Sequence, residues 1–471
     1  MKFFLAILIL FNLLAFSAQG SSIWSDPLRS ENAMPASRPE KCEININNEE
    51  LDLAEAIDIA LCNNTDTRIA WWNAKSSASS LGKARAEYLP NIKAGTSFQK
   101  LNTINNNSSI ADPHYTSYGP SATLTWLLYD FGGRGARIES AKQQMLMAGF
   151  SYSNSMQNIL FQVIKNYANV LIAEESVKAA KESEESANKI FTAATIKLKV
   201  GTVTPADKAQ AEALYSGSTL NRQNAENVLQ IARGNFAVTL HLSPTKKIKL
   251  KPINFDQTNK PLPGEVEDLI RQAIEQRPDI AATRAAAKLA ASNLKQAKAS
   301  NYPTISANAS ASKTFYGESA LRSRIDNSLG LQLSIPIFTG FSNHYQIQAA
   351  QNSYQAAEVQ LLKAEDTAAL DIWTSYNNYK TAKIAFETSK NLVRSAEMSE
   401  QLTFGRYRAG KGNLLDAINA QATLAGARFT LVQAKNNLLI TKFDLNRALG
   451  DINLSNTDLG EVSVTPNPIP Y

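Results

Sequence analysis

The segment SLGLQLSIPIF, residues 328–338, alternates apolar side chains with small or polar ones. This period-two pattern is typical of a β-strand that has one apolar and one wet face. The segment 304–312 repeats the pattern, and each stretch has about the 9–11 residues that a tilted strand needs to cross a bilayer. We therefore predict two membrane-spanning strands, at about 304–312 and 328–337, joined by a polar loop.

The same unit occurs earlier in the chain. Pro90 and Pro303 occupy equivalent positions 213 residues apart (303 − 90), and the later landmarks Gly201 and Gly410 are 209 apart (410 − 201). The earlier copy predicts strands at about 91–101 and 119–130, with weaker alternation. Aromatic residues at the strand ends are candidates for the membrane interface: Trp126, Tyr129 and Phe338.

Four strands are too few for a closed wall. Even small barrels take about eight strands, and an open sheet edge in lipid leaves backbone groups unpaired at a prohibitive cost. The strands must therefore be shared among subunits. Three protomers that each supply four strands, about twelve in all, form the smallest symmetric barrel with a usable lumen. The sequence predicts a homotrimer in contact with membrane lipid.

Long stretches without proline follow each strand pair. They predict helices at about 134–200 and 341–409, each roughly 100 Å long at 1.5 Å per residue. Apolar residues recur along them at spacings of three and four, as packed helices require. Shorter helices are expected at about 51–89, 204–241 and 413–449. The predicted fold is mainly α, with long antiparallel coiled-coil helices and a small β part, and with an internal duplication.

The chain ends lie outside the duplicated region. Lys2, an apolar run and small residues up to Gly20 predict a signal peptide. Six segments result, in chain order: the signal peptide 1–20, an N-terminal extension 21–50, the first repeat 51–242, a linker 243–263, the second repeat 264–450 and a C-terminal tail 451–471.

Composition narrows the function. The formal charge of +6 is mild and no dense basic block exists, so nucleic-acid binding has no support. In an exported protein, the two cysteines Cys42 and Cys62 predict a disulfide. The three histidines are scattered, and no metal-site spacing or nucleophile–base arrangement is recognisable. We expect no enzyme, no metal and no cofactor.

Two helix–helix turns carry the most specific local signals. The first has Gly201 as a helix-ending residue, Thr204 as the N-cap and Asp207 three positions later, which together form a capping box. The second turn repeats this arrangement with Asn413 as the cap and Asp416 three positions later. The two aspartates therefore have two compatible interpretations, as helix caps or as functional carboxylates.

The duplicated layout and these turns resemble the TolC family of trimeric outer-membrane efflux and secretion channels. The match is continuous from Tyr407 to Gly450 and covers roughly residues 50–450. The resemblance implies a 12-stranded trimeric transmembrane β-barrel in the cell outer membrane and a periplasmic α-barrel whose coiled coils close like an iris. It also implies two partners: a periplasmic membrane-fusion (adaptor) protein and an inner-membrane RND or ABC transporter.

The resemblance also implies roles for single residues. Paired aspartates ring the family's periplasmic constriction, and the matching positions here are Asp416 and Asn419, so one ring of carboxylates remains. Asp207 and Tyr407 match two positions of the family's iris clamp. Gly412 stands where the family has a clamping arginine, so we expect closure either to be looser here or to be held by other residues such as Lys411 or Arg408. The turn residues expected to contact the adaptor are Gly201, Thr202, Gly410 and Lys411.

The leading interpretation is a passive duct of a tripartite efflux or type I secretion system, opened by movement of the coiled coils. A dedicated protein-secretion channel, rather than one for small molecules, is an open alternative. A structural or adhesive helical outer-membrane protein is a remote one, because the strand pairs are duplicated along the chain and do not form one terminal block.

Overall fold

The computed structural model describes residues 27–28, 50–102, 114–252, 265–317 and 322–450. The predicted signal peptide, nearly all of the N-terminal extension and the C-terminal tail lie outside these residues. The chain divides into two compact units, which we describe separately. One consists mainly of Asn73–Gly149 and Ala282–Leu362 and holds the strands; the other consists mainly of Phe150–Ala281 and Lys363–Tyr471.

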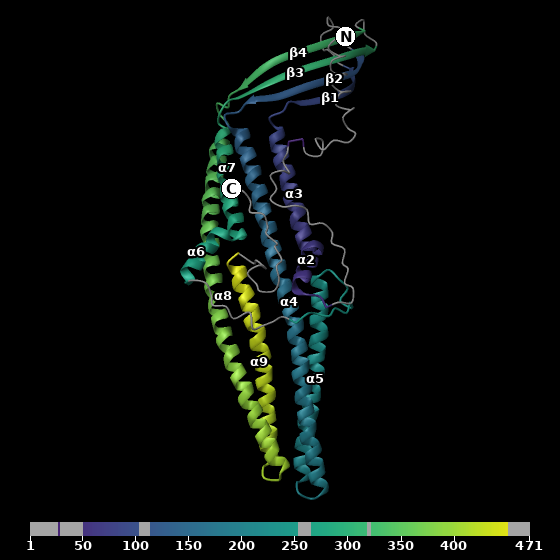
Figure 1. Cartoon of the computed structure of the whole chain (residues 1–471). Coiled ribbons are helices and arrows are strands. Elements are labelled where there is room, and N and C mark those ends of the chain that lie inside the picture. Colours follow the sequence, from purple (N-terminus) through teal and green to yellow (C-terminus); the bar gives the residue numbers. More distant parts are fainter. Residues whose placement is uncertain (1–26, 29–49, 103–113, 253–264, 318–321, 451–471) are drawn as a thin grey trace. The chain divides into compact units, whose positions relative to one another are not determined.

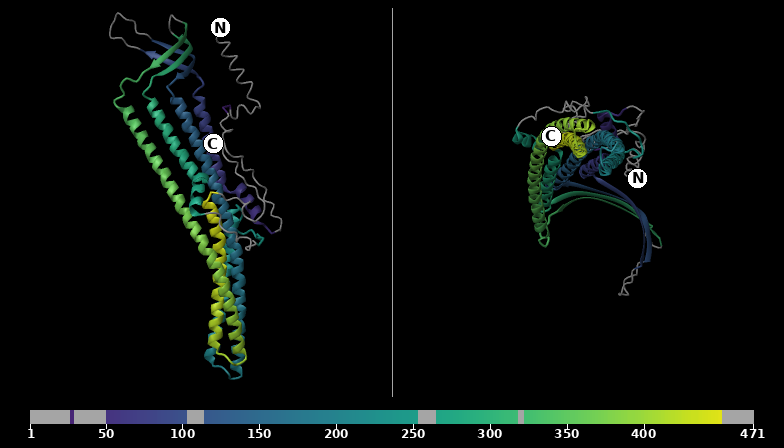
Figure 2. Two further views of the ribbon diagram at one scale, coloured as in Figure 1. Left: turned by 60° about the vertical axis from the view of Figure 1, so that its left-hand side comes forward. Right: turned by 90° about the horizontal axis from the view of Figure 1, so that it is seen from below.

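The strand-bearing unit contains one antiparallel sheet of four strands in the order β1-β2-β3-β4 (Figure 1). The view from below in Figure 2 shows that this sheet is curved. All four strands were predicted, and three of them extend further into the expected loops or start earlier. Their bounds are β1 Asn91–Asn102, β2 His114–Tyr129, β3 Thr304–Gly317 and β4 Ser323–Ser334.

The register places the apolar residues of both copies on one face of the sheet. Ile92 lies opposite Leu124, Leu124 opposite Ala309, and Ala309 opposite Leu329. Large side chains on this face are exposed, and Leu331 retains 76% of its accessible surface. An apolar sheet face of this size is typical of a surface in contact with lipid or protein.

A buried arginine anchors the joint between β2 and the long helix α4 (Gly133–Lys199). Arg134 donates hydrogen bonds to the carbonyls of Leu127 (2.6 Å) and Leu128 (2.7 Å), and its own N–H donates to Asp130 Oδ2 at 2.6 Å. The chain turns sharply here, because Phe131 and Gly132 have φ values of 50° and 90°. The arginine replaces the hydrogen bonds that the end of the strand would otherwise lack.

Seven further helices complete the described residues. A single helix over 51–89 was predicted, and that prediction is wrong. The chain breaks at Asn64, whose extended backbone (ψ 134°) and side chain, which accepts from Asp66 N at 2.7 Å, start a new helix. The second copy breaks at Arg277 before a proline, which disfavours helical backbone in the preceding residue. The bounds are α2 Leu53–Asn63, α3 Thr65–Ala86, α5 Pro205–Thr239, α6 Val266–Gln276, α7 Pro278–Ala299, α8 Ser342–Arg408 and α9 Leu414–Ala448.

The main core of the second unit lies between α2, α4, α5 and α9. Tyr167 lies at its centre and donates hydrogen bonds to the carbonyls of Leu51 (3.0 Å) and Lys251 (2.6 Å), which flank a short parallel bridge. Burial raises the pKa of Tyr167 well above its usual value. The hydroxyl therefore acts as a permanent donor that ties the chain segments on both sides of the core.

Across the described residues, none of the helices combines the length and the apolar character that a membrane span requires.

Candidate functional site

The two helix–helix turns of the second unit share one geometry, and Figures 1 and 2 show both at the same end of that unit. Gly201 (φ 77°) and Gly410 (φ 71°) end α4 and α8 in the left-handed conformation that glycine adopts without strain. In each turn the next residue donates its N–H five positions back, from Thr202 to Lys197 O at 3.0 Å and from Lys411 to Arg406 O at 2.9 Å. We call the two turns together the tip. Its predicted adaptor-contact residues are exposed, and their role stays a prediction.

The first turn of α5 contains the predicted capping box. Thr204 Oγ1 accepts from Asp207 N at 3.2 Å, and Asp207 Oδ2 accepts from Thr204 N at 2.8 Å. The N–H and the hydroxyl of Thr204 both donate to the Asp207 carboxylate at 2.8 Å, and these two bonds lower the pKa of Asp207. Asp207 is therefore an ionised helix cap at neutral pH, which agrees with the structural interpretation of this carboxylate.

The aspartate of the second turn, Asp416, does not take part in a capping box. Asn413 caps α9 alone, accepting from Leu415 N at 3.3 Å. Asp416 and Asn419 are both exposed, three positions apart in the first turn of α9, and so lie on one face of the helix. Within the described residues the Asp416 carboxylate makes no ion pair or hydrogen bond, whereas Oδ2 of Asp207 accepts two hydrogen bonds from Thr204.

Tyr407 is buried, with 2% of its surface exposed, and its hydroxyl has no hydrogen-bond partner among the described residues. Burial, and secondarily the charge of Asp207, raise the pKa of the Tyr407 hydroxyl. Within one protomer the Tyr407 hydroxyl makes no hydrogen bond with Asp207, whose Oδ2 accepts from Thr204. The joint role of these two residues in closure stays a prediction.

The contact that does form at Tyr407 involves Lys197, which sequence reasoning missed. Lys197 Nζ donates to the carbonyl oxygen of Tyr407 at 2.5 Å and lies 4.0 Å from the centre of its ring. Lys197 belongs to the last turn of α4 and Tyr407 to the last turn of α8, so this contact ties the two helical hairpins together. Because the acceptor is a backbone atom, the sequence carried no signal for it.

An apolar cluster lies next to these contacts and joins the four helices that the two turns of the tip connect. Its buried members come from α4, α5, α8 and α9, and partly buried aromatic rings pack against them. Phe191 and Tyr215 stack with their ring centres 5.9 Å apart. The buried residues are Ile190, Ala194, Ala211, Tyr407, Leu414 and Ala417.

Ion pairs continue the seam between α4 and α9. Arg428 bridges Glu182 at 3.1 Å and Glu397 at 3.2 Å, and Lys435 pairs with Glu175. A mostly exposed pair contributes little, but a shared arginine with two carboxylates forms a network of greater value. These ion pairs lie between the apolar cluster at the tip and the main apolar core, to which Leu439 and Phe443 of α9 contribute.

A partly buried charge cluster centred on Arg277 lies at the break before α7. Arg277 is 7% exposed and donates to both carboxylate oxygens of Asp279 (3.0 and 2.7 Å), to Asp371 (3.3 Å) and to the carbonyl of Ala448 (3.2 Å). Burial works to raise the pKa of Asp279, but the bonds and charge of Arg277 outweigh burial, so the pKa is lowered. This stabilisation is fully present above the unfolded pKa of about 3.9 and is lost as the pH falls through the lower folded value.

The predicted interface aromatics lie at one end of the strands. Trp126 Nε1 donates to Tyr88 O at 2.9 Å, Tyr129 packs edge-on against Phe131 at 4.7 Å, and Phe338 is exposed. A second aromatic row lies further along the apolar face, where Tyr118 stacks on Phe315 with ring centres 5.4 Å apart. Tyr115 and Tyr316 form a separate ring contact on the opposite face of the sheet. Trp126 and Tyr118 are eight residues apart on one strand, roughly 26 Å at 3.3 Å per residue.

Cys62 is disulfide-bonded. Its predicted partner, Cys42, lies outside the described residues, so the pairing itself stays a prediction. No group of three or more metal-ligating side chains occurs among the described residues.

An apolar strand face between two aromatic rows, combined with paired helical hairpins, defines a class: the outer-membrane channel subunit. The model of the outer membrane efflux protein family matches residues 56–238 and 269–451. The two matched segments begin 213 residues apart (269 − 56), which is the offset of the sequence duplication. The chain belongs to the outer membrane efflux protein family, whose members are channels located in the outer membrane with a periplasmic helical part.

Individual relatives agree. The chain is 27% identical to protein CyaE of Bordetella pertussis over 87% of this chain and 86% of that one. It is 26% identical to outer membrane protein TolC of Escherichia coli, covering 79% and 77%. Among solved structures, the CmeC outer membrane channel of Campylobacter jejuni superposes with a TM-score of 0.76 at 19% identity, covering 84% and 85%. The predicted resemblance to the TolC family is confirmed, and the fold of channel protomers with it.

Proposed function

We propose that this chain is one protomer of a homotrimer that forms a passive duct across the outer membrane and is gated at the tip. The observation that carries the proposal is the pairing of the sheet. Within the described residues, β1 and β4 each have one neighbouring strand. An edge strand within lipid leaves backbone groups without partners. Closure through three copies supplies those partners to both edges at once.

The helices support the same arrangement. In the second unit, α5 and α8 both leave large apolar residues exposed, among them Val238 on α5 and Trp373 on α8. The two faces belong to different helices, so a contact between them joins unlike surfaces of two copies. Contacts of unlike surfaces generate rings when the rotation closes. The exposed apolar residues are Leu220, Val228, Ile231 and Val238 on α5 and Leu370, Trp373, Ile384, Leu392, Met398 and Leu402 on α8.

The two aromatic rows support insertion of the strands into lipid. Their spacing along β2 is roughly 26 Å by strand rise, which a strand tilt of about 40° reduces to roughly 20 Å of height, somewhat less than the apolar band of outer-membrane barrels, about 25 Å. Trp126 and Tyr129 belong to one row and Tyr118 to the other. The exposed apolar face between the rows faces the hydrocarbon interior.

The gate is the seam between the α4/α5 and α8/α9 hairpins. Lys197 holds the end of α8 through the Tyr407 carbonyl, and Arg428 and Lys435 hold α9 against α4. Opening moves the α8/α9 hairpin away and exchanges these polar contacts for water. A small number of charge-assisted hydrogen bonds and ion pairs therefore determines the free-energy difference between the closed and open positions of the α8/α9 hairpin.

The duct requires partners that supply energy and direction. A periplasmic adaptor contacts the exposed tip residues Gly201, Thr202, Gly410 and Lys411, and an inner-membrane RND or ABC transporter drives export. The lumen performs no chemistry, so the chain is not an enzyme and needs no cofactor. In a strain that lacks the gene, loss of tolerance to toxic small molecules identifies an efflux cargo. Loss of one polypeptide from the medium identifies protein secretion.

The carboxylate ring of the gate gives a direct test. Asp416→Asn is expected to abolish block by a trivalent cation added on the tip side and to weaken cation selectivity, because it removes three charges at the constriction. Asn419→Asp is expected to have the opposite effect and tighten the block, because it adds a second ring. Single-channel recordings in planar bilayers measure both. Unchanged block in both variants contradicts the placement of α9 at the constriction.

A further inference from the structure

The outer edge of β4 has no neighbouring strand among the described residues. In the first copy, β2 continues through Trp126 to Tyr129, beyond the last residue that β1 pairs with, Thr125. These last residues are held as a strand by β3. In the second copy, β4 stops at Ser334, although the alternation of side chains continues for another three residues, to Ile337. Two features coincide with this end: Pro336 has no N–H to donate to a ladder, and β4 has no neighbouring strand on its outer edge among the described residues.

The internal duplication identifies that neighbour. The pair Asn91–Thr125 in β1–β2 recurs as Thr304–Ser334 in β3–β4, with offsets of 213 (304 − 91) and 209 (334 − 125). β2 therefore corresponds to β4, and β3 corresponds to β1. Because β2 pairs with β3 inside the chain, β4 must pair with a β1 that this chain does not supply. That strand belongs to a second copy.

We infer that the register of this seam between protomers equals the β2–β3 register carried through the duplication. The pair Thr123–Ser310 then becomes Gln332 opposite Ser97 of the partner subunit. The pair Thr125–Asn308 becomes Ser334 opposite Gly95 of the partner subunit. The inference rests on the proposed trimer but adds residue-level register, which closure alone does not determine.

The side chains fit this register. Transferring Ala122–Ala311 gives Leu331 opposite Phe98 of the partner subunit, two residues that lie on the apolar face. A slip by one residue would place Leu331 opposite a residue of the polar face, because side chains alternate with a period of two. The inferred register therefore keeps the apolar face continuous from one protomer to the next.

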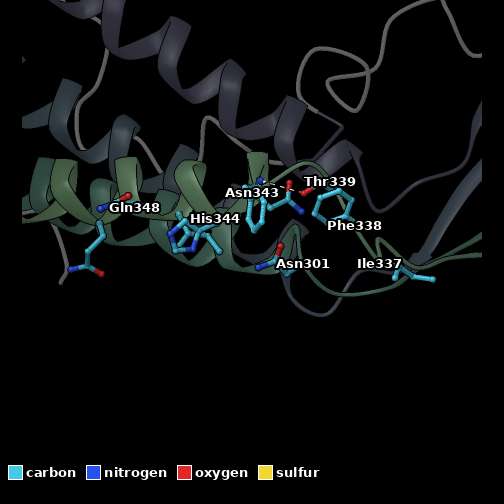
Figure 3. A pocket seen from close by; sticks show the side chains of 10 residues that line it. Asn301, Ile337, Phe338, Thr339, Asn343, His344 and Gln348 are labelled. Atoms are coloured by element: carbon cyan, nitrogen blue, oxygen red, sulfur yellow. Dashed lines mark hydrogen bonds between the residues drawn. The ribbon is translucent and has the colours of Figure 1, made fainter.

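The joint after β4 also has space for the partner. A cavity of about 420 Å³ opens there, with Phe338, Asn343 and His344 among the residues that line it (Figure 3). In the first copy, Tyr302 stacks on Phe131 beside the corresponding joint, with ring centres 5.7 Å apart. Subtracting 213 from 302 gives Leu89, which is exposed in this chain. The register brings Leu89 of the partner subunit to this cavity.

Disulfide trapping tests the register on the lumen side of the sheet. The double variant Gln332→Cys with Ser97→Cys, expressed as the full chain and treated with a mild oxidant in membranes, is expected to yield crosslinked dimers and trimers on non-reducing gels. Directly opposite Cβ atoms are about 4.5–5.5 Å apart, close to disulfide range, whereas diagonal neighbours are about 7–8 Å apart. The matched control, Gln332→Cys with Gln99→Cys, is therefore expected to yield roughly tenfold less.

A second pair protects the test against misfolding of one variant. Ser334→Cys with Gly95→Cys reports the same register, and a side chain at Gly95 meets only Ser121 Oγ at 3.7 Å. Preferential crosslinking of the Gln99 control, or no crosslink in either designed pair while the protein runs as a trimer by native mass, overturns the register and leaves the proposed duct intact. A monomeric mass overturns both.

Discussion

Lys197→Met is expected to hold the channel open. The substitution keeps a straight side chain of similar length at this position but removes the hydrogen bond from Nζ to the Tyr407 carbonyl and the contact of the ammonium group with the Tyr407 ring. A hydrogen bond from a charged group contributes about 1.5–3 kcal/mol, which corresponds to roughly a 10- to 150-fold shift of the closed–open equilibrium. Single-channel recordings in planar bilayers should show a larger mean conductance and longer open times.

Lys199→Met is the matched control. Lys199 lies in the same last turn of α4, carries the same charge and is exposed. Its loss changes the local potential as the Lys197 variant does, but removes no contact with α8. Equal conductance of the two variants would assign any effect to charge alone and remove Lys197 from the gate.

Arg277→Met is expected to cause the largest loss of stability. It leaves Asp279 and Asp371 without their common partner and the Ala448 carbonyl without a donor, in a partly buried site. Breaking a buried pair by removing one partner costs about 3–5 kcal/mol, and the partial exposure of the two aspartates places the expected cost near the lower value. The apparent melting temperature in detergent, followed by helical circular dichroism, should fall clearly.

Arg271→Met provides the comparison for that measurement. Arg271 pairs with Asp268 at 2.8 Å, but both side chains are largely exposed. Exposed pairs contribute about 0–1 kcal/mol, so this variant is expected to melt close to the parent. A similar fall in melting temperature in both variants would show that the burial of Arg277 does not increase the contribution of its ion pairs to stability.

The strands were the most predictable part of the fold. Period-two alternation depends on the two faces of a strand meeting different surroundings, and it therefore survives in the sequence without knowledge of the partners. The ends were less predictable. β4 stops at Ser334 although the pattern continues to Ile337, because Pro336 has no N–H to donate and because strand length also depends on a neighbouring strand that the described residues do not contain.

The helix break at Asn64 and the Lys197 contact at the tip could not be predicted from the sequence, whereas the capping box at Thr204 could. Asn64 interrupts a helix without proline or glycine, through a local side-chain bond that competes with the helix. The capping box at Thr204 was predicted because capping is local and carried by residue types. Lys197 was missed because its partner is a backbone oxygen 210 positions away (407 − 197), and backbone atoms leave no trace in the sequence.

The central claim is that three copies of this chain close one wall of strands. Native mass measurement of the detergent-extracted protein tests it most directly, because four strands from one chain have no closed form of their own. The account predicts a single species with the mass of three chains. A stable species with the mass of one chain, inserted in membranes and retaining its strands, would contradict it.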